Sequence, residues 1–304
     1  MMLKLDNISK TFRTVKAVDG LSMEVGDGEI VALLGPNGAG KTTSVRMIVQ
    51  IIQPDSGRIH YSPDITETSG EVRRDRLGYL PEERGLYQEI PVIRNLLYLA
   101  GLRGVEPDVA RKDALEWLER LELTERADEK VSALSKGNQQ KVQFIASVLH
   151  KPRLAVLDEP FSGFDPINQE RISSAITDLR NGGMTILLSA HQMQLVERIA
   201  DRILLIGDGR ELLSGTLSEI RKKMIAAQKL SVEYDGEPMT VAIRSIPGIQ
   251  DVESGINGGL SVYMTEDADL NRVLKGLADA GRIRNLQTAD ISLHEIYLHS
   301  FRKS

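Results

Sequence analysis

Short apolar runs separated by polar or glycine-rich turns mark the first two thirds of the chain. Alternation over residues 21–25 predicts a half-exposed strand, and the continuous run at 30–34 predicts a buried parallel strand. Further runs at 154–157 and 185–188 predict two more buried strands. After the run at 30–34, apolar residues at helical spacing predict a helix that stops at Pro54: Val45, Ile48, Val49 and Ile52. Strands that alternate with helices predict a parallel α/β sheet with ligands at the carboxyl ends of the strands.

A helix-rich segment lies between these strands, from about residue 88 to residue 150. Two sets of apolar residues recur there at helical spacing: Leu115, Leu118 and Leu121, and then Val142, Ile145, Ala146 and Leu149. We therefore expect a helical insertion into the sheet domain.

The pattern changes at about residue 230 to short alternating runs. Four runs predict strands, at 230–234, 249–253, 260–264 and 283–288, and helical segments around Val241 and at 270–280 separate them. A turn is expected at 255–259, and a closing helix at 292–301. The order strand, helix, strand, strand, helix, strand is that of a small ferredoxin-like α+β domain.

Two domains are expected in a chain of 304 residues. The charged stretch 221–223 predicts a linker at 221–228, which separates a first domain at 1–220 from a second at 229–304.

Composition and charge exclude several classes of function. The chain has 38 Lys and Arg against 43 Asp and Glu, a formal charge of −5, which argues against a nucleic-acid partner held by a broad basic surface. It has no cysteine, so disulfides, zinc-thiolate sites and thiol catalysis are excluded. The longest stretch without a charged residue, 181–196, is too short and too polar to span a bilayer, and the N-terminus carries no secretory signal. Work at a membrane would need a partner.

A phosphate-binding loop joins the strand at 30–34 to the helix after it. Residues 35–42 match G-x-x-x-x-G-K-[ST], a loop whose backbone N–H groups surround a phosphate at a helix N-terminus. Lys41 is expected to neutralise the β- and γ-phosphates, and the Thr42 hydroxyl to ligate Mg²⁺. The expected nucleotide contacts are Gly35, Pro36, Asn37, Gly38, Ala39, Gly40, Lys41, Thr42 and Thr43.

Two carboxylates follow the strand at 154–157. Asp158 is expected to hold Mg²⁺ through water, and Glu159 to orient or deprotonate an attacking water. Acidic residues often end strands, so this pair indicates a nucleotide site only in combination with the phosphate-binding loop.

The segment Leu134-Ser135-Lys136-Gly137-Asn138, just before a predicted helix, resembles the L-S-G-G-Q signature of the ATP-binding subunits of ABC transporters. The resemblance implies that Ser135, Lys136, Gly137 and Asn138 contact ATP held on the opposite subunit. Lys136 and Asn138 depart from the family pattern.

Other family elements follow in the expected order. The resemblance implies that Phe12 stacks on adenine and that His191 contacts the γ-phosphate. Glu82 stands where the family's Q-loop carries glutamine, and a carboxylate there can still ligate Mg²⁺. Residues 162–165 resemble the D-loop.

The resemblance covers about residues 1–220 and implies a P-loop NTPase (RecA-like) core that binds ATP and Mg²⁺. With one phosphate loop and one signature per chain, a second ATP-binding subunit is expected, in a homodimer that closes head to tail. A transmembrane permease is the other expected partner, which would hold the protein at the cytoplasmic face of the membrane.

Residues 80–87, 134–138 and 292–298 are similar to the sodium-efflux (NatA-type) branch of the family, which favours export of a cation or a small toxic solute. The apolar group Tyr87, Ile90, Val92, Leu96 and Leu97 is either a contact surface for the permease or core of the insertion. A soluble ABC-type ATPase without a transport role is the main alternative. A small GTPase or kinase would leave the signature unexplained, and the chain has no Asn-Lys-x-Asp motif.

Overall fold

A computed structural model describes residues 1–304 except 69, 84, 224–227, 255–258, 266 and 303–304. The chain divides into two compact units, Met1–Ser214 and Gly215–Ser304. The sequence places this boundary at residue 220 because of the charged stretch 221–223, whereas those residues belong to a helix, α7 (Leu217–Lys223), of the second unit. Residues 224–227 of the expected linker lie outside the described part of the chain.

The first unit is built on a six-stranded sheet. Its strands lie in the order β5 (Leu77–Leu80), β6 (Leu154–Asp158), β7 (Thr185–Ala190), β3 (Ile30–Leu34), β8 (Arg202–Gly207) and β9 (Arg210–Gly215). The pairs from β5 to β8 are parallel, and β3, β6 and β7 are buried along their whole length. This confirms the three buried strands and the parallel sheet that the apolar runs predict.

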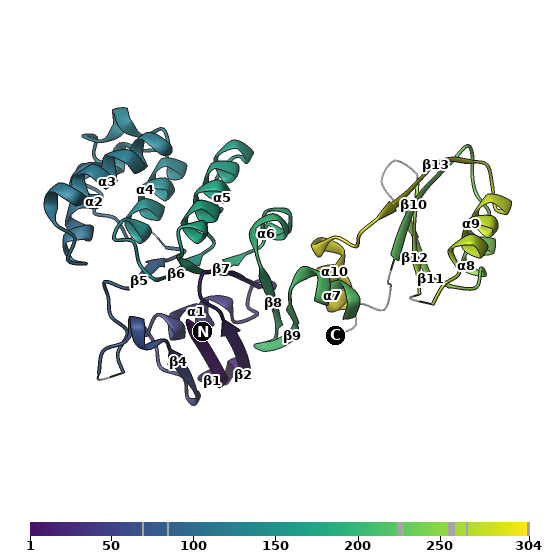
Figure 1. The fold of residues 1–304 in the computed structure, drawn as a ribbon, viewed down its shortest axis with the longest axis horizontal. Coiled ribbons are helices and arrows are strands. Elements are labelled where there is room, and N and C mark those ends of the chain that lie inside the picture. The colour runs from purple at the N-terminus through teal and green to yellow at the C-terminus, as the bar shows by residue number, and fades with distance from the viewer. Residues whose placement is uncertain (69, 84, 224–227, 255–258, 266, 303–304) are drawn as a thin grey trace. The chain divides into compact units, whose positions relative to one another are not determined.

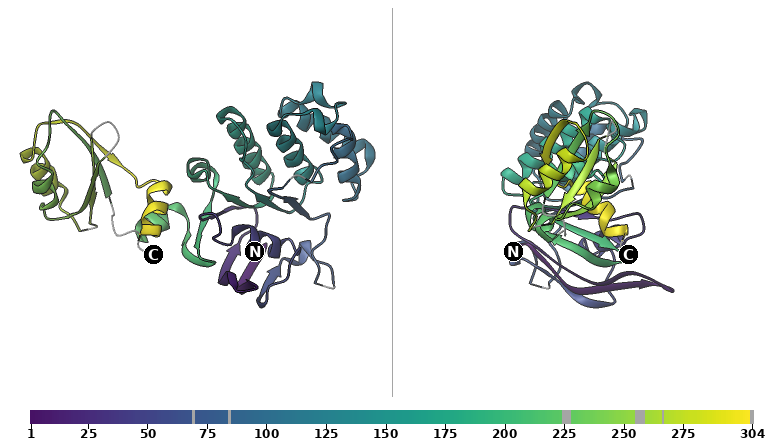
Figure 2. Two further views of the ribbon diagram at one scale, coloured as in Figure 1. Left: turned by 180° about the vertical axis from the view of Figure 1, so that it is seen from behind. Right: turned by 90° about the vertical axis from the view of Figure 1, so that its right-hand side faces the viewer.

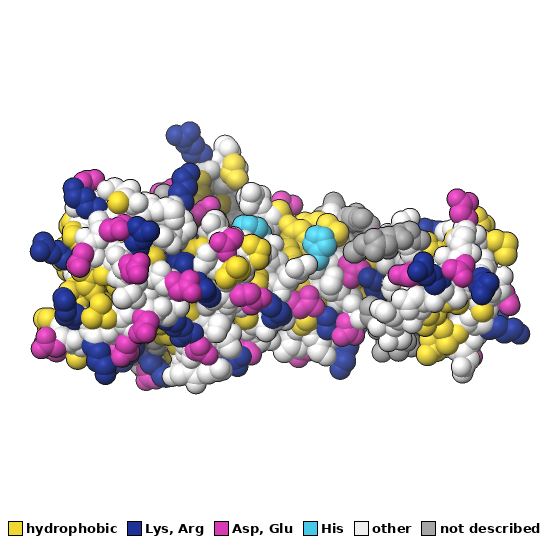
Figure 3. Space-filling view, turned by 90° about the horizontal axis from the view of Figure 1, so that it is seen from above, with side chains coloured by type: hydrophobic (Ala, Val, Ile, Leu, Met, Phe, Trp, Pro, Cys, Tyr) yellow, Lys and Arg dark blue, Asp and Glu magenta, His cyan; other side chains and the backbone are white. Residues whose placement is uncertain are grey.

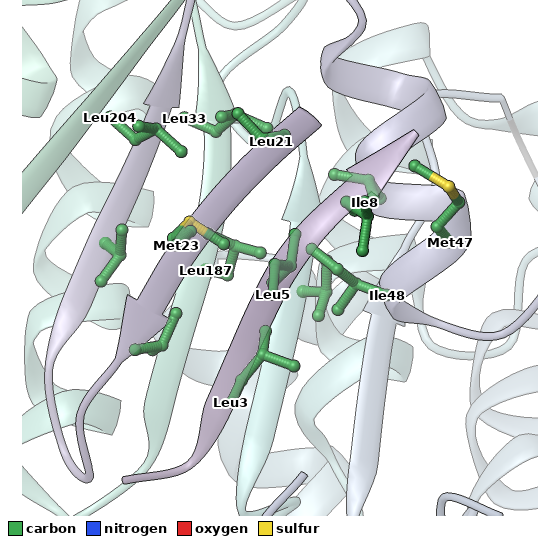
Figure 4. Close-up of a cluster of buried hydrophobic side chains, with 14 of the residues drawn as sticks. Leu3, Leu5, Ile8, Leu21, Met23, Leu33, Met47, Ile48, Leu187 and Leu204 are labelled. Carbon is green, nitrogen blue, oxygen red and sulfur yellow. The ribbon is translucent and has the colours of Figure 1, made fainter. Parts of the chain in front are cut away.

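A second, antiparallel sheet packs against the first over helix α1 (Lys41–Ile48). It consists of β2 (Val15–Val25), β1 (Leu3–Phe12) and β4 (Ser56–Tyr61). Figure 4 shows side chains of β1 and β2 meeting Leu33, Leu187 and Leu204 of the large sheet and Ile48 of α1 in one apolar core. The predicted helix is shorter than its stripe, because Gln50 has a φ of +59° and ends it.

Helices cover the other face of the large sheet (Figures 1 and 2). The expected insertion contains α2 (Val92–Gly101), α3 (Pro107–Arg120) and α4 (Lys136–Val148), with one-turn helices at Thr124–Arg126 and Val131–Ala133. α5 (Pro166–Asn181) and α6 (Met193–Ile199) follow, and another one-turn helix lies at Pro63–Ile65. Leu118, Leu121 and Val142 are buried as expected, whereas Leu115 is exposed.

The second unit has its own sheet and core. After α7 come β10 (Gln228–Tyr234), α8 (Thr240–Arg244), β11 (Ile249–Ser254), β12 (Leu260–Met264), α9 (Leu270–Asp279), β13 (Ile283–Ala289) and α10 (Leu293–Arg302). The elements follow one another as the sequence predicts, and the four antiparallel strands lie in the order β11-β12-β10-β13, as in a ferredoxin-like unit. Most of the turn expected at 255–259 lies outside the described residues.

Candidate functional site

Glycines allow the phosphate-binding loop to fold between β3 and α1. Gly38 and Gly40 have φ values of +84° and +99°, which disfavour other residues. A Cβ atom on Gly40 would lie only 2.3 Å from the carbonyl oxygen of Ala17 in β2. The motif therefore satisfies a steric requirement as well as a chemical one.

Lys41 lies in the first turn of α1 with its side chain turned back into the loop. Its Nζ donates to the carbonyl oxygens of Gly35, at 2.8 Å, and Pro36, at 3.2 Å. Thr42 and Thr43 follow it and are half-buried. A positive charge at a helix N-terminus, within a loop of N–H groups, is a site for a phosphate group.

Asp158, Ser189 and Glu159 form a buried network at the ends of β6 and β7. The hydroxyl of Ser189 donates to Asp158 Oδ1 at 2.5 Å and accepts the backbone N–H of Glu159 at 3.0 Å. Asp158 Oδ2 is buried with no hydrogen-bond partner among the described residues. An unpaired carboxylate oxygen, with the Thr42 hydroxyl in the neighbouring phosphate-binding loop, fits Mg²⁺, which binds oxygen ligands.

Glu159 and His191 are paired at the edge of this network. His191 Nδ1 lies 2.7 Å from Glu159 Oε2, and the side chain of Glu159 is 12% exposed against 60% for that of His191. Burial raises the pKa of Glu159 above its ordinary value, and the positive charges of His191 and Lys41 counteract part of that increase. Glu159 also has a φ of +53°, a conformation that glutamate rarely adopts.

Glu82 lies on the exposed segment after β5. Its negative charge contributes to the pKa of Tyr79. Burial and the negative charges of Asp158 and Glu82 raise that pKa, while Arg46 of α1 lowers it. The same tyrosine therefore lies within electrostatic reach of both acidic groups that the sequence assigns to the metal. Unlike Asp158, Glu82 is open to solvent.

The signature residues lie at the start of α4. Ser135 is its N-cap, and its Oγ accepts the N–H of Asn138 at 3.3 Å. Lys136 is exposed, and a Cβ on Gly137 would lie 3.7 Å from the carbonyl oxygen of Gly163 in the D-loop segment. The signature of a chain thus borders its own D-loop.

The structure brings Lys41, Asp158, Glu159 and His191 into one neighbourhood. Phe12 lies at the end of β1, with the residue 47% exposed and the Lys10 ammonium 5.8 Å from its ring centroid. An exposed aromatic face is what stacking on a base requires.

Sequence reasoning missed Ser189, whose hydroxyl joins the carboxylate of Asp158 to the backbone N–H of Glu159. Its signal is weak but readable, since it is a polar residue that follows the apolar run 186–188, two positions before His191. The apolar group at 87–97 divides in the structure. Val92 and Leu96 are core, whereas Tyr87 and Ile90 are exposed.

Further observations concern membrane-spanning helices, metal clusters and surface charge. Among the residues that the structure describes, no helix has the length and apolar character to cross a membrane, and no three acidic or histidine side chains form a metal cluster. Acidic and basic side chains are interspersed on the face drawn in Figure 3, with no continuous basic patch there.

The parallel sheet, the glycine loop around Lys41 and the acidic ends of the strands define a P-loop ATPase. The ABC transporter family profile matches residues 18–162, and the profile of the C-terminal domain of DrrA1-3-like ATP-binding proteins matches residues 215–301. The chain belongs to the ATP-hydrolysing ATP-binding proteins of ABC transporters, in the group with a DrrA-like C-terminal domain.

Two known relatives align with nearly the whole chain. The ABC transporter ATP-binding protein YhaQ of Bacillus subtilis is 39% identical over 98% of this chain and 97% of its own length. The linearmycin resistance ATP-binding protein LnrL of the same organism is 30% identical over 98% and 97%. The dimeric structure of the ATP-binding cassette MJ0796 bound to ADP and Pi matches 71% of this chain and 99% of its own, at 25% identity and a TM-score of 0.64.

Proposed function

We propose that this protein is the ATPase subunit of an exporter in which two copies close head to tail around two Mg²⁺-ATP and drive a separate transmembrane permease. The observation that carries the proposal is the buried network of Asp158, Ser189 and Glu159 beside Lys41. It combines a phosphate-binding loop, an unpaired oxygen for a metal and a carboxylate of raised pKa, which together make up a hydrolytic site.

Each residue has a defined role in this proposal. The loop from Gly35 to Thr43 binds the phosphates, Lys41 neutralises the β- and γ-phosphates, and Phe12 stacks on adenine. Thr42, Asp158 and Glu82 hold Mg²⁺, which when bound offsets negative charge on the phosphates. Glu159 takes the proton of the attacking water, and His191 orients Glu159 and contacts the γ-phosphate.

The signature supplies the argument for a second copy. Gly137 borders the D-loop of its own chain, and the first turn of α4, capped by the exposed Ser135, with Lys136 and Asn138 beside it, suits a γ-phosphate presented by another subunit. The dimer of the cassette MJ0796 supports this arrangement.

Relatives and surface residues support the transport role. LnrL is named for resistance to linearmycin, and the second unit matches a domain of DrrA-like proteins. We therefore favour export of a small toxic solute, with a cation, as in the sodium-efflux branch, as the other candidate. Tyr87, Ile90 and Tyr98 are exposed, with the Tyr87 and Tyr98 rings 5.6 Å apart, and offer the permease an apolar contact at the cytoplasmic face of the membrane.

The test uses affinity-tagged wild type and the Glu159→Gln variant in the native cells. Membranes are solubilised in mild detergent, and the co-purifying proteins and the rate of ATP hydrolysis are measured. An integral membrane protein should accompany both chains at near-equal stoichiometry. Glu159→Gln should hydrolyse ATP about 10²–10⁴-fold more slowly and stay as an ATP-bound dimer.

Glu116→Gln is the control, since Glu116 is an exposed glutamate on α3 that pairs with nearby Lys112. It should hydrolyse ATP at the wild-type rate. Recovery of the tagged protein only from the soluble fraction, or with ribosomes or nucleic acid, would overturn the transport role in favour of a soluble ATPase. A Glu159→Gln variant with normal turnover would overturn the assignment of the base.

A further inference from the structure

Gln143 on α4 holds the segment that carries Glu82. Its Nε2 donates to two backbone carbonyl oxygens, that of Pro81 at 3.1 Å and that of Glu83 at 2.9 Å. These two residues flank Glu82, so one amide group holds a backbone carbonyl on each side of it. The Gln143 side chain is buried, with the residue only 4% exposed.

The last turn of α4 and the turn after it contact strand β5. A Cβ atom on Gly78 of β5 would lie 2.3 Å from the carbonyl oxygen of Ser147, so the two backbones touch. His150, just beyond α4, has its Nε2 3.1 Å from the carbonyl oxygen of Leu77. Positions 143 and 147 are spaced i and i+4 and share one face of α4, and His150 follows them in the turn after the helix. β5 and the Glu82 segment are therefore held against α4 by three neighbouring contacts.

The same helix carries the signature at its other end. Ser135 caps α4, and Gly137 precedes Gln143 by six residues, a rise of about 9 Å along the axis. The part of the chain that is proposed to meet the partner's ATP is thus joined through one rigid element to the part proposed to ligate the metal.

The hydrogen bonds of the Gln143 side-chain amide indicate which segment it holds. Gln143 Oε1 is buried and has no hydrogen-bond partner among the described residues. Burying an unpaired amide oxygen is unfavourable, and an apolar side chain of the same length would avoid it. Both N–H contacts of the amide go to the Glu82 segment, so that segment is where the group acts.

We propose that Gln143 is a positioning residue for ATP hydrolysis, one that fixes Glu82 relative to the signature end of α4. The inference rests on the proposed role of Glu82 as a metal ligand. If Gln143 had a purely structural role, its hydrogen bonds would stabilise α4, and the effect of replacing it would not depend on the Glu82 carboxylate.

A double-mutant cycle on the full chain separates the two roles. ATP hydrolysis is measured for wild type, Gln143→Met, Glu82→Ala and the double variant, and thermal unfolding shows that each is folded. Gln143→Met keeps the length of the side chain but has no N–H group. It should lower kcat by about tenfold with little change in the KM for ATP, because a displaced group affects the reacting complex more than binding. In the Glu82→Ala background the same change should cost less than about twofold.

Gln139→Met is the matched control. Gln139 is also a buried glutamine of α4 whose Nε2 bridges two carbonyl oxygens, those of Val131 and Leu134, each at 3.0 Å. Its effect on kcat should be independent of Glu82 and add to that of Glu82→Ala. Gln143→Asn, which keeps the amide but shortens its reach, is the second variant and should follow Gln143→Met.

The outcomes distinguish the inference from its premise. If Glu82→Ala leaves kcat unchanged, the proposed role of Glu82 is wrong and the inference falls with it. If Glu82→Ala lowers kcat but the effects of Gln143→Met and Gln143→Asn simply add to it, Glu82 keeps its role and the positioning inference alone is overturned.

Discussion

The hydroxyl of Ser189 organises the proposed hydrolytic site at the scale of single residues. It satisfies Asp158 Oδ1 and the backbone N–H of Glu159 together, which leaves Asp158 Oδ2 free. A buried polar group that loses its partner costs about 1–3 kcal/mol, so this serine stabilises the arrangement of both acidic groups. The site is therefore held in place before any ligand arrives.

In the proposed mechanism Glu159 is the base, so the pKa of its carboxyl group predicts the acid side of the pH profile. A base must be deprotonated to accept a proton, so activity falls as the pH drops through its pKa. Burial raises the pKa of Glu159 above 4.5, and the positive charges of His191 and Lys41 lower it. His191→Ala should therefore move the acid limb of kcat/KM for ATP to higher pH, in addition to lowering its height.

His60→Ala is the control for this experiment, because His60 is an exposed histidine on β4, outside the site. It should leave the midpoint of the acid limb where it is in wild type. Protonation of ATP affects all three proteins equally, so only the difference between them reports on Glu159. An acid limb of His191→Ala that coincides with that of wild type would contradict the coupling of the two residues.

The sequence predicts the residues of the site that follow a local rule. The spacing of the glycines and Lys41 is enough to identify the loop, and Asp158, Glu159 and His191 each follow a buried strand. Ser189 and Gln143 escape such reasoning because their partners lie 30 and 60 or more residues away in the chain. Only the paired strands and the packed helix bring them together.

At the scale of elements, the contact between α4 and β5 is a tight steric constraint near the site. Gly78→Ala would place a Cβ atom 2.3 Å from the carbonyl oxygen of Ser147. Because neither backbone can move without disturbing its own element, we expect a loss of about 1–3 kcal/mol in the free energy of unfolding, measured in urea. ATP hydrolysis should fall as well, since the Glu82 segment follows β5.

Gly101→Ala is the comparison for Gly78→Ala. Gly101 ends α2, and a Cβ atom there meets nothing within 4 Å. Alanine is the better helix former by about 1 kcal/mol, so this variant should be as stable as wild type or more so. Equal stability of the two alanine variants would show that α4 and β5 separate easily.

Elements were predictable where periodicity extends over a whole segment, as in the ferredoxin-like order of the second unit. Their ends were not. The apolar stripe of α1 continues to Ile52, yet the helix stops at Ile48, and Val49 and Ile52 still pack on the core. Apolar spacing reports burial, which a turn can also provide, so it places the end of a helix poorly.

At the scale of the whole molecule, two separate cores are the main feature. The second unit has its own cluster, which includes Val262, Val273 and Leu277, all fully buried. Leu277→Ala should destabilise that unit by about 2–5 kcal/mol through the cavity it leaves. Calorimetry should show a lower transition temperature for the second unit, with the transition of the first unit unchanged.

Leu118→Ala provides the reciprocal variant, because Leu118 is fully buried in the helical insertion of the first unit. It should lower the transition of the first unit and reduce ATP hydrolysis near that temperature. A single transition that shifts as a whole in both variants would show that the two cores unfold as one.

The positive φ of Glu159 has a consequence for the evolution of the chain. Glycine adopts that conformation without strain, whereas glutamate there costs on the order of 1–3 kcal/mol. Selection for heat resistance alone would favour loss of this glutamate, and selection for transport would restore it. Thermal stability and the rate of ATP hydrolysis therefore place opposite demands on this one position.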